Sequence, residues 1–223
     1  CWAREPETGK IRGFLLDASL PGIKRTRIEN KTALRTVQNA DIELTDVRVR
    51  EADRLAGIDS FEDTKHLLRG SRIMVGWQAV GQQLAAFDVA RAYAVERMQF
   101  GRPLASFQLV QQQLVRMQGN AVASTGMLAR VSELEQGGYG AVSDDGTARG
   151  DMARAALAKS YASALMRETV SLGRSLLGGN GIVSDYRMAR IFADAEAIYT
   201  YEGTYEINTL IAGREITGVS ALR

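Results

Sequence analysis

The pattern of apolar and polar positions changes its period once along the chain, near residue 60. Before this point the apolar runs are short: residues 10–16 are strand-like, Pro21 and Gly22 signal a turn, and residues 23–28 and 41–49 alternate apolar and polar side chains. Such alternation is typical of half-buried strands. Because a few strands this short cannot close a sheet by themselves, we expect residues 1–60 to form the end of a β-barrel that begins upstream.

From about residue 62 the apolar positions recur every three or four residues, which predicts long amphipathic helices. The first expected seam, with a 4-3-4-3 spacing, consists of Ile73, Trp77, Val80, Leu84 and Phe87. The second, which Ser124 interrupts, consists of Phe107, Val110, Leu114, Met117, Ala121, Leu128 and Val131. The third consists of Ala155, Ala158, Ala162, Leu165, Thr169, Leu172 and Leu176. Its small side chains imply that helices approach closely.

Two further helices and two interruptions complete the helical region. A shorter helix is expected from about Asp185, and a terminal helix from Thr204 to Thr217 with Gly218 as its stop signal. The glycine-rich residues 137–140 and the polar residues 143–150 break the pattern. Long antiparallel helices joined by short loops predict a mainly α fold, with an up-down bundle over residues 61–223.

Composition and charge exclude several classes of function. The 223 residues are 45% hydrophobic, and a formal net charge of +2 with scattered basic residues favours neither a nucleic-acid groove nor an anionic membrane surface. No apolar run approaches the length of a membrane span, so no membrane insertion is expected. One cysteine, Cys1, and one histidine, His66, can make neither an internal disulfide nor a zinc cluster, so no metal is expected. The opening at Cys1, without an initiator methionine, suggests a start inside a longer protein, with any targeting region elsewhere.

A single carboxylate, Glu202, stands out between the last two expected helices. It lies between Tyr201 and Gly203 and just before Thr204, a good N-cap residue. Two interpretations fit this position. Glu202 is either an acid near a helix start, favoured by the helix dipole, or a general base. Spacing alone is more typical of the acid near a helix start, whereas the glycine, which would leave room for a substrate, and the tyrosines, which could exclude water, would suit the base.

Two other segments carry candidate ligand contacts. In residues 97–104, Gly101 and Pro103 end one helix and start the next, and Arg97 is either a solvated loop residue or a partner for an anionic group. Residues 177–182 are glycine-rich but do not follow a strand, so neither a Rossmann fingerprint nor a P-loop fits. They are either a helix end with left-handed glycines or bare backbone that a large planar ligand can approach.

A pair of arginines opens the first long helix. Arg69 and Arg72 flank Gly70 and Ser71, and a basic first turn is unfavourable to the helix dipole, which makes this a candidate site. His66 is interpreted as a polar residue at the helix start and not as a catalyst.

Three motifs occur in order: Arg97-Met-Gln-Phe-Gly-Arg-Pro-Leu104, Leu177-Gly-Gly-Asn-Gly181 and Tyr201-Glu-Gly-Thr204. Together they resemble the C-terminal half of an acyl-CoA dehydrogenase, over essentially the whole chain. The most similar branch is the glutaryl-CoA dehydrogenases. The resemblance implies a helical bundle, residues 61–223, behind the end of a middle β-barrel, residues 1–60. It also implies that Glu202 is the catalytic base.

The same resemblance implies contacts to two ligands. Those to flavin adenine dinucleotide (FAD), held mainly by a neighbouring subunit, are Arg97, Phe100, Gln108, Ser175, Leu176, Leu177, Gly178, Gly179 and Thr204. Those to the acyl-CoA substrate are Arg69, Ser71, Arg72 and Gly203. The family often has glutamine where Ser175 stands, so that contact stays open. Isovaleryl and long-chain enzymes place their glutamate immediately before the arginine that Arg72 matches; here Ser71 occupies that place, which points to Glu202.

The implied activity is α,β-dehydrogenation of an acyl-CoA thioester. Glu202 would remove the α-proton, flavin N5 would receive the hydride, and an electron-transferring flavoprotein would reoxidise the cofactor. The glutaryl branch would add decarboxylation to crotonyl-CoA. Two alternatives are an acyl-CoA oxidase, which passes electrons to oxygen, and a non-catalytic helical assembly module. The expected assembly is a homotetramer, in the cytoplasm of a bacterium or the mitochondrial matrix of a eukaryote.

Overall fold

The structure, a computed structural model, describes residues 1–58, 60, 63–136 and 151–221. It divides into two compact units, Cys1–Leu68 and Arg69–Arg223, and each is considered by itself. The interruptions expected at residues 137–140 and 143–150 lie outside the described residues.

The first unit contains two small antiparallel ribbons. β1 (Trp2–Arg4) pairs with β2 (Ile11–Gly13), and β3 (Ile23–Arg27) pairs with β4 (Ala40–Leu44), followed by the short 3-10 helix η1 (Glu51–Asp53). β2, β3 and β4 overlap the three segments that the sequence pattern predicts but are shorter than expected, and β1 was not among those segments. A two-stranded ribbon is only marginally stable in water, and every residue of β4 is exposed. That these strands end a β-barrel stays a prediction.

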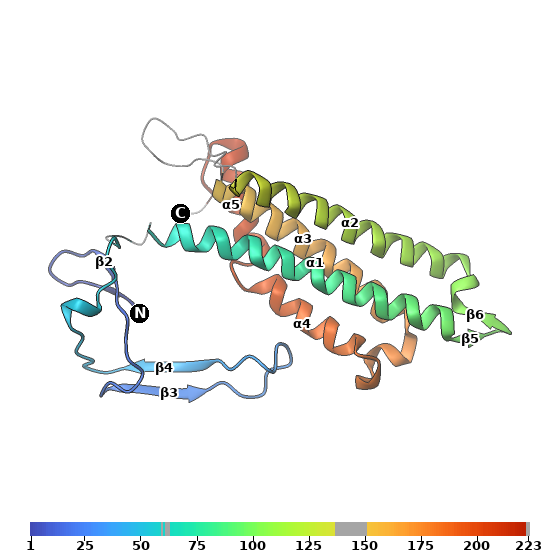
Figure 1. Cartoon of the computed structure of the whole chain (residues 1–223), viewed down its shortest axis with the longest axis horizontal. Helices are drawn as coiled ribbons and strands as arrows, with labels where there is room; N and C mark the ends of the chain where they lie inside the picture. The colour runs from blue at the N-terminus through green and yellow to red at the C-terminus, as the bar shows by residue number, and fades with distance from the viewer. Residues whose placement is uncertain (59, 61–62, 137–150, 222–223) are drawn as a thin grey trace. The chain divides into compact units, whose positions relative to one another are not determined.

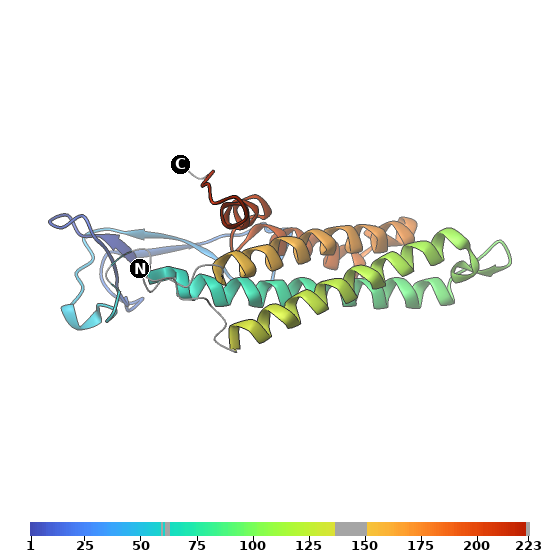
Figure 2. The ribbon, with the colours of Figure 1, turned by 90° about the horizontal axis from the view of Figure 1, so that it is seen from above.

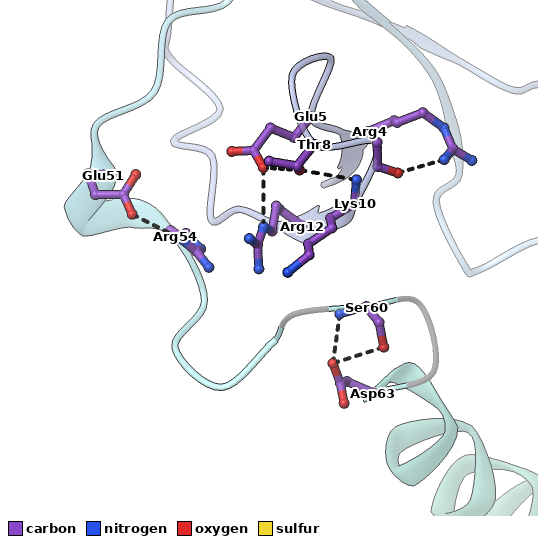
Figure 3. A network of polar contacts seen from close by, with 10 residues as sticks. Arg4, Glu5, Thr8, Lys10, Arg12, Glu51, Arg54, Ser60 and Asp63 are labelled. Atoms are coloured by element: carbon purple, nitrogen blue, oxygen red, sulfur yellow. Dashed lines mark hydrogen bonds and ion pairs between the residues drawn. The ribbon is translucent and has the colours of Figure 1, made fainter.

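Polar contacts fix the turns of this unit (Figure 3). Glu5 accepts a hydrogen bond from Thr8 and lies 3.7 Å from Arg12 Nε, while Arg54 pairs with Glu51 at 3.2 Å. The Thr8 hydroxyl, followed by Arg12 and other nearby cations, lowers the pKa of Glu5 against a smaller effect of desolvation. Because exposed ion pairs contribute little stability, these contacts shape the loops without anchoring a core.

The second unit is a helical bundle, which confirms the mainly α fold (Figure 1). Its helices are α1 (Thr64–Glu96), α2 (Gln108–Gln136), α3 (Asp151–Leu176), α4 (Met188–Thr200) and α5 (Tyr205–Thr217). α3 is central, because it packs against α2, α4 and α5. α5 is seen nearly end-on in Figure 2 and therefore crosses the long helices.

Short elements join the helices. The hairpin of β5 (Met98–Gln99) and β6 (Arg102–Pro103), then the 3-10 helix η3 (Leu104–Ser106), connect α1 to α2. The 3-10 helices η4 (Gly178–Ile182) and η5 (Ser184–Tyr186) connect α3 to α4. The helix expected from about Asp185 is α4, which begins at Met188.

The bundle core corrects part of the first predicted seam. Trp77 and Leu84 were expected inside, but they are 38% and 44% exposed. α1 instead buries a neighbouring line of mostly small residues: Val75, Gly76, Ala79, Val80, Ala86, Ala90 and Ala94. Gly76 shows why, since a Cβ there would lie 2.6 Å from Leu128 Cδ1. Small residues let α1 and α2 approach closely, and the bulky side chains turn outward.

The central residues of the other two predicted seams are buried, which confirms those parts of the prediction. Met117 and Leu128 of α2 and Ala158 of α3 are fully covered. Ser124 does not merely interrupt the second seam, because its hydroxyl accepts a 2.9 Å hydrogen bond from the buried amide of Gln83.

The ends of α5 follow the sequence signals. Thr204 is the N-cap, and its hydroxyl accepts a 3.3 Å hydrogen bond from the backbone N–H of Ile207. Gly218 closes the helix with a left-handed φ of 71°. Among the residues that the structure describes, no helix combines the length and apolar character that a membrane span requires.

Candidate active site

The turn between α4 and α5 has an unusual backbone. Glu202 and Gly203 have φ angles of 57° and 81°, both in the left-handed region. This region is uncommon for glutamate and persists only where the surroundings fix it. Gly203 suits the position on two counts, because a Cβ there would be strained and would lie 3.0 Å from Asn208 Nδ2. The turn therefore holds the Glu202 side chain in a set direction.

Helix α1 meets this turn with two side chains. The Ser71 hydroxyl donates a 2.7 Å hydrogen bond to Oε2 of Glu202, and Arg72 Nε donates one of 3.4 Å to the Glu202 carbonyl oxygen. Arg72 is only 7% exposed. Burial lowers the pKa of its guanidinium, and the charge of Glu202 opposes that shift. The sequence analysis placed Ser71 and Arg72 in the first turn of this helix. Because α1 begins at Thr64, both residues instead lie after its first turn.

Two buried residues that the sequence did not single out support the same turn. Lys159 Nζ donates to the carbonyl oxygens of Tyr199 (3.0 Å) and Gly203 (2.8 Å). The amide of Asn208 donates to the carbonyls of Glu202, Gly203 and Thr204 at 3.3, 2.7 and 3.1 Å. A lysine inside an alanine-rich buried seam was the available signal for the first of these residues.

Tyrosines border the turn. Tyr201 donates a hydrogen bond to the side chain of Gln78, and burial, then the charge of Glu202, raises the pKa of its phenol. Tyr199 stacks on Tyr205 with ring centroids 5.5 Å apart. The carboxylate is thus half-buried beside aromatic groups, as the sequence had indicated for a base.

Two predicted contact residues already have partners within the chain. The Thr204 hydroxyl serves as the N-cap of α5, and Arg69 pairs with Glu135 at 2.9 Å. Their predicted roles toward FAD and substrate stay predictions.

A second cluster lies where α1 ends. Arg97 and Gln108 are exposed, and Phe100, at the tip of the β5–β6 hairpin, is 91% exposed with a φ of 52°. Arg102 covers the Phe107 ring at 4.1 Å. The loop expected here is therefore a tight hairpin that presents arginine and aromatic side chains outward.

The glycine turn belongs to the same end of the bundle. Gly178 and Gly179 have no atom within 4 Å of where a Cβ would be, whereas Leu176 and Leu177 are buried and Ser175 is exposed. Asn180 fixes the turn against α1, because its amide donates a 2.9 Å hydrogen bond to the Tyr93 hydroxyl. The open glycines thus lie near the hairpin.

The predicted contacts therefore form two groups at opposite ends of α1. Arg72, beside Glu202, and Arg97, beside the hairpin, are separated by about 37 Å at the helical rise of about 1.5 Å per residue. In Figure 1, α5 lies near one end of the bundle and the β5–β6 hairpin lies at the other. One ligand would have to span most of the bundle to touch both groups.

The fold and site define a helical domain that presents a fixed carboxylate at one end and an exposed arginine and glycine surface at the other. Residues 61–217 match the family described as acyl-CoA dehydrogenase, C-terminal domain. The chain belongs to the acyl-CoA dehydrogenase family.

Individual relatives agree with this assignment. A crystal structure of glutaryl-CoA dehydrogenase from Mycobacterium smegmatis superposes with a TM-score of 0.90 at 31% identity, covering 100% of this chain and 54% of that one. A probable acyl-CoA dehydrogenase of Bacillus subtilis is 31% identical over 207 residues, 92% of this chain and 52% of its own length. The CarC subunit of the caffeyl-CoA reductase–Etf complex of Acetobacterium woodii is 27% identical over 92% of this chain and 52% of its own. The chain thus spans about half the length of these relatives.

Proposed function

We propose that the protein is an FAD-dependent acyl-CoA dehydrogenase in which Glu202 is the base that removes the α-proton of the thioester. The observation that carries this proposal is the left-handed turn that holds the Glu202 carboxylate 2.7 Å from Ser71, beside the buried Arg72. A general base must be held in position before it can act efficiently. Ser71 of α1 bonds the carboxylate itself, while Lys159 of α3 and Asn208 of α5 bond the backbone of the turn.

Three of the residues predicted to hold FAD, Arg97, Gly178 and Gly179, are suited to that group. Arg97 is exposed, as a partner for a pyrophosphate must be, and a guanidinium fork matches two anionic oxygens. Gly178 and Gly179 leave open space over their backbone, where a planar ring system can approach. The remaining implied contacts are Phe100, Gln108, Ser175, Leu176, Leu177 and Thr204. When bound, FAD supplies the acceptor for the β-hydrogen, which leaves as hydride.

The chain's own residues then have distinct tasks at the Glu202 end. The carboxylate takes the α-proton on its oxygen, Ser71 keeps that oxygen oriented, and Arg72 adds a positive charge beside the turn. Gly203 leaves room for the Asn208 amide, which supports the turn through the Gly203 carbonyl, so the room for substrate that the sequence suggested here is taken by Asn208. The Acetobacterium woodii relative is named as part of a reductase. Proton and hydride transfer are reversible, and for this chain we propose the direction of dehydrogenation.

Glutaryl-CoA, with decarboxylation to crotonyl-CoA, is the proposed substrate. It is supported by the superposition on the glutaryl-CoA dehydrogenase and by the motifs of that branch. An acyl-CoA oxidase is the alternative with the same base and cofactor, and a non-catalytic assembly module is the alternative without chemistry.

We further propose that the protein works as a homotetramer and passes electrons to an electron-transferring flavoprotein. The separation of Arg97 from Glu202 supports an assembly of more than one copy, because a ligand that touched both groups on one copy would have to span most of the bundle. An Etf complex in the name of one relative supports the second part.

A spectroscopic experiment tests the function. The whole protein, purified with its cofactor, should show a flavin visible spectrum that bleaches when glutaryl-CoA is added without oxygen. Butyryl-CoA, which lacks the distal carboxylate, is the matched control for the acyl group. Hydrogen peroxide formed during aerobic turnover would indicate the oxidase, and a protein without flavin would contradict the proposal.

A further inference from the structure

A buried cation lies beneath the Glu202 turn and has no part in the motifs above. Lys159 belongs to α3 and is the largest fully buried side chain among the described residues. Lysine is almost never fully buried unless it has partners, because desolvating an ammonium group is unfavourable. Its place in the core therefore calls for a specific role.

The partners of Lys159 are backbone oxygens on both sides of Glu202. One is the carbonyl of Tyr199, in the last turn of α4, where helix carbonyls have no partner within the helix. The other is the carbonyl of Gly203, directly after Glu202, which also accepts from Asn208. A single ammonium group thus joins the end of α4 to the residue that follows the carboxylate.

The charges around this ammonium group come from three elements. Arg72 faces it from α1, Glu202 from the turn and Glu206 from α5. Burial lowers the pKa of Lys159 to about 8, Arg72 adds to that shift, and the two carboxylates oppose it. The lysine is therefore still charged at neutral pH, where the two carbonyl oxygens accept its hydrogen bonds and the two carboxylates favour its charged form.

We infer that Lys159 is a positioning residue for Glu202, whose ammonium group holds the turn in the left-handed conformation that keeps the carboxylate beside Ser71. Left-handed glutamate is a strained conformation that needs such outside support. The inference rests on the proposed function in one respect, that Glu202 is the base.

The test compares Lys159→Met with wild type in the whole, cofactor-loaded protein. Methionine keeps an unbranched side chain but donates no hydrogen bond. We expect kcat to fall about 10- to 100-fold with KM and flavin content near those of wild type, because a misplaced base slows only the chemical step. A second readout needs no activity: backbone amides of residues 199–205 should exchange with solvent faster than in wild type, while those of α2 should not.

Gln83→Met is the matched control. Gln83 is equally buried, and its amide donates to Ser124 and the Ala162 carbonyl, away from the turn. This variant should lower Tm yet leave kcat and exchange at residues 199–205 unchanged. Lys159→Arg, which keeps charge and donors, should restore part of the lost kcat. If Lys159→Met does not fold, Lys159→Gln, too short to bridge both carbonyls, should show the same losses.

Wild-type exchange at residues 199–205 in the Met or Gln variant would overturn the inference, as would an equal loss of kcat in Gln83→Met. If no acyl-CoA reduces the flavin of the wild-type protein, the proposed function is wrong, whatever the role of Lys159. The exchange comparison then still decides whether Lys159 holds the turn.

Discussion

Ser71 and Glu202 are 131 positions apart in the sequence, yet the serine hydroxyl lies 2.7 Å from a carboxylate oxygen of the glutamate. The first part of α1 and the turn after α4, which are far apart in the sequence, are thus joined by a hydrogen bond to one carboxylate oxygen.

Glu202→Gln should abolish turnover while flavin content and acyl-CoA binding stay near wild type. Glutamine keeps the size and can accept the Ser71 hydrogen bond, but it cannot take up the α-proton. Loss of a general base typically lowers a rate about 10²–10⁴-fold, and the effect should be at the upper end because hydride departure depends on that proton. Anaerobic stopped-flow mixing measures flavin bleaching, and bleaching at the wild-type rate would identify another residue as the base.

Ser71→Ala should lower kcat about 10- to 100-fold, since a hydrogen bond to a charged group contributes about 1.5–3 kcal/mol. Ser132→Ala is its control, because Ser132 of α2 accepts a hydrogen bond from Trp77 of α1 and has no contact with Glu202 among the described hydrogen bonds. Steady-state kinetics separate two roles. A raised KM with unchanged kcat would mean that Ser71 contacts the substrate and does not orient the base.

Arg97→Ala should weaken flavin retention, by about 1.5–3 kcal/mol if a charge-assisted contact to phosphate is lost. The fold should survive, because Arg97 is exposed at the end of α1. Flavin absorbance after dialysis is the measurement. Arg130→Ala, at an exposed arginine that pairs with Glu133 on α2, is the control, and equal flavin loss in both would refute a specific contact.

The pH dependence of stability should reveal Lys159. Its pKa is about 8 in the folded chain and near the ordinary 10.5 when unfolded, so between these values the unfolded chain binds more protons. The free energy of unfolding should therefore rise from pH 8 to 10.5 by up to about 3 kcal/mol through this group, and this gain is lost as pH falls toward 8. The free energy of unfolding, measured from melting curves at several pH values in this range, should rise more steeply with pH in wild type than in Lys159→Met. Parallel curves would contradict the shift.

Sedimentation of the whole protein should show an assembly larger than one copy, because all the predicted flavin contacts except Thr204 lie at the opposite end of the bundle from the proposed base. A single copy that retains flavin and turns over acyl-CoA would exclude a shared site.

The sequence predicted the helices well because their signals are local. Thr204 and Gly218 bound α5 through caps that need no distant partner. The buried face of α1 was predicted less well, since apolar side chains lie on two of its faces and only the neighbouring helix decides which is covered. Trp77 is outside for that reason.

The candidate site also has a part that the sequence predicted and a part that it did not. The Glu202 turn could be recognised from four adjacent residues. The roles of Lys159 and Asn208 could not, because their partners are backbone carbonyls, which every sequence contains. Their placement depends on how α3 and α5 pack, and no spacing along the chain reports it.

The distance between Arg97 and Glu202 has a genetic consequence. If each working centre combines one copy's hairpin with another copy's carboxylate, a cell that carries one allele damaged at Arg97 and another damaged at Glu202 can still assemble some intact centres. Two null alleles would then complement each other, whereas two different alleles damaged at the same end would not.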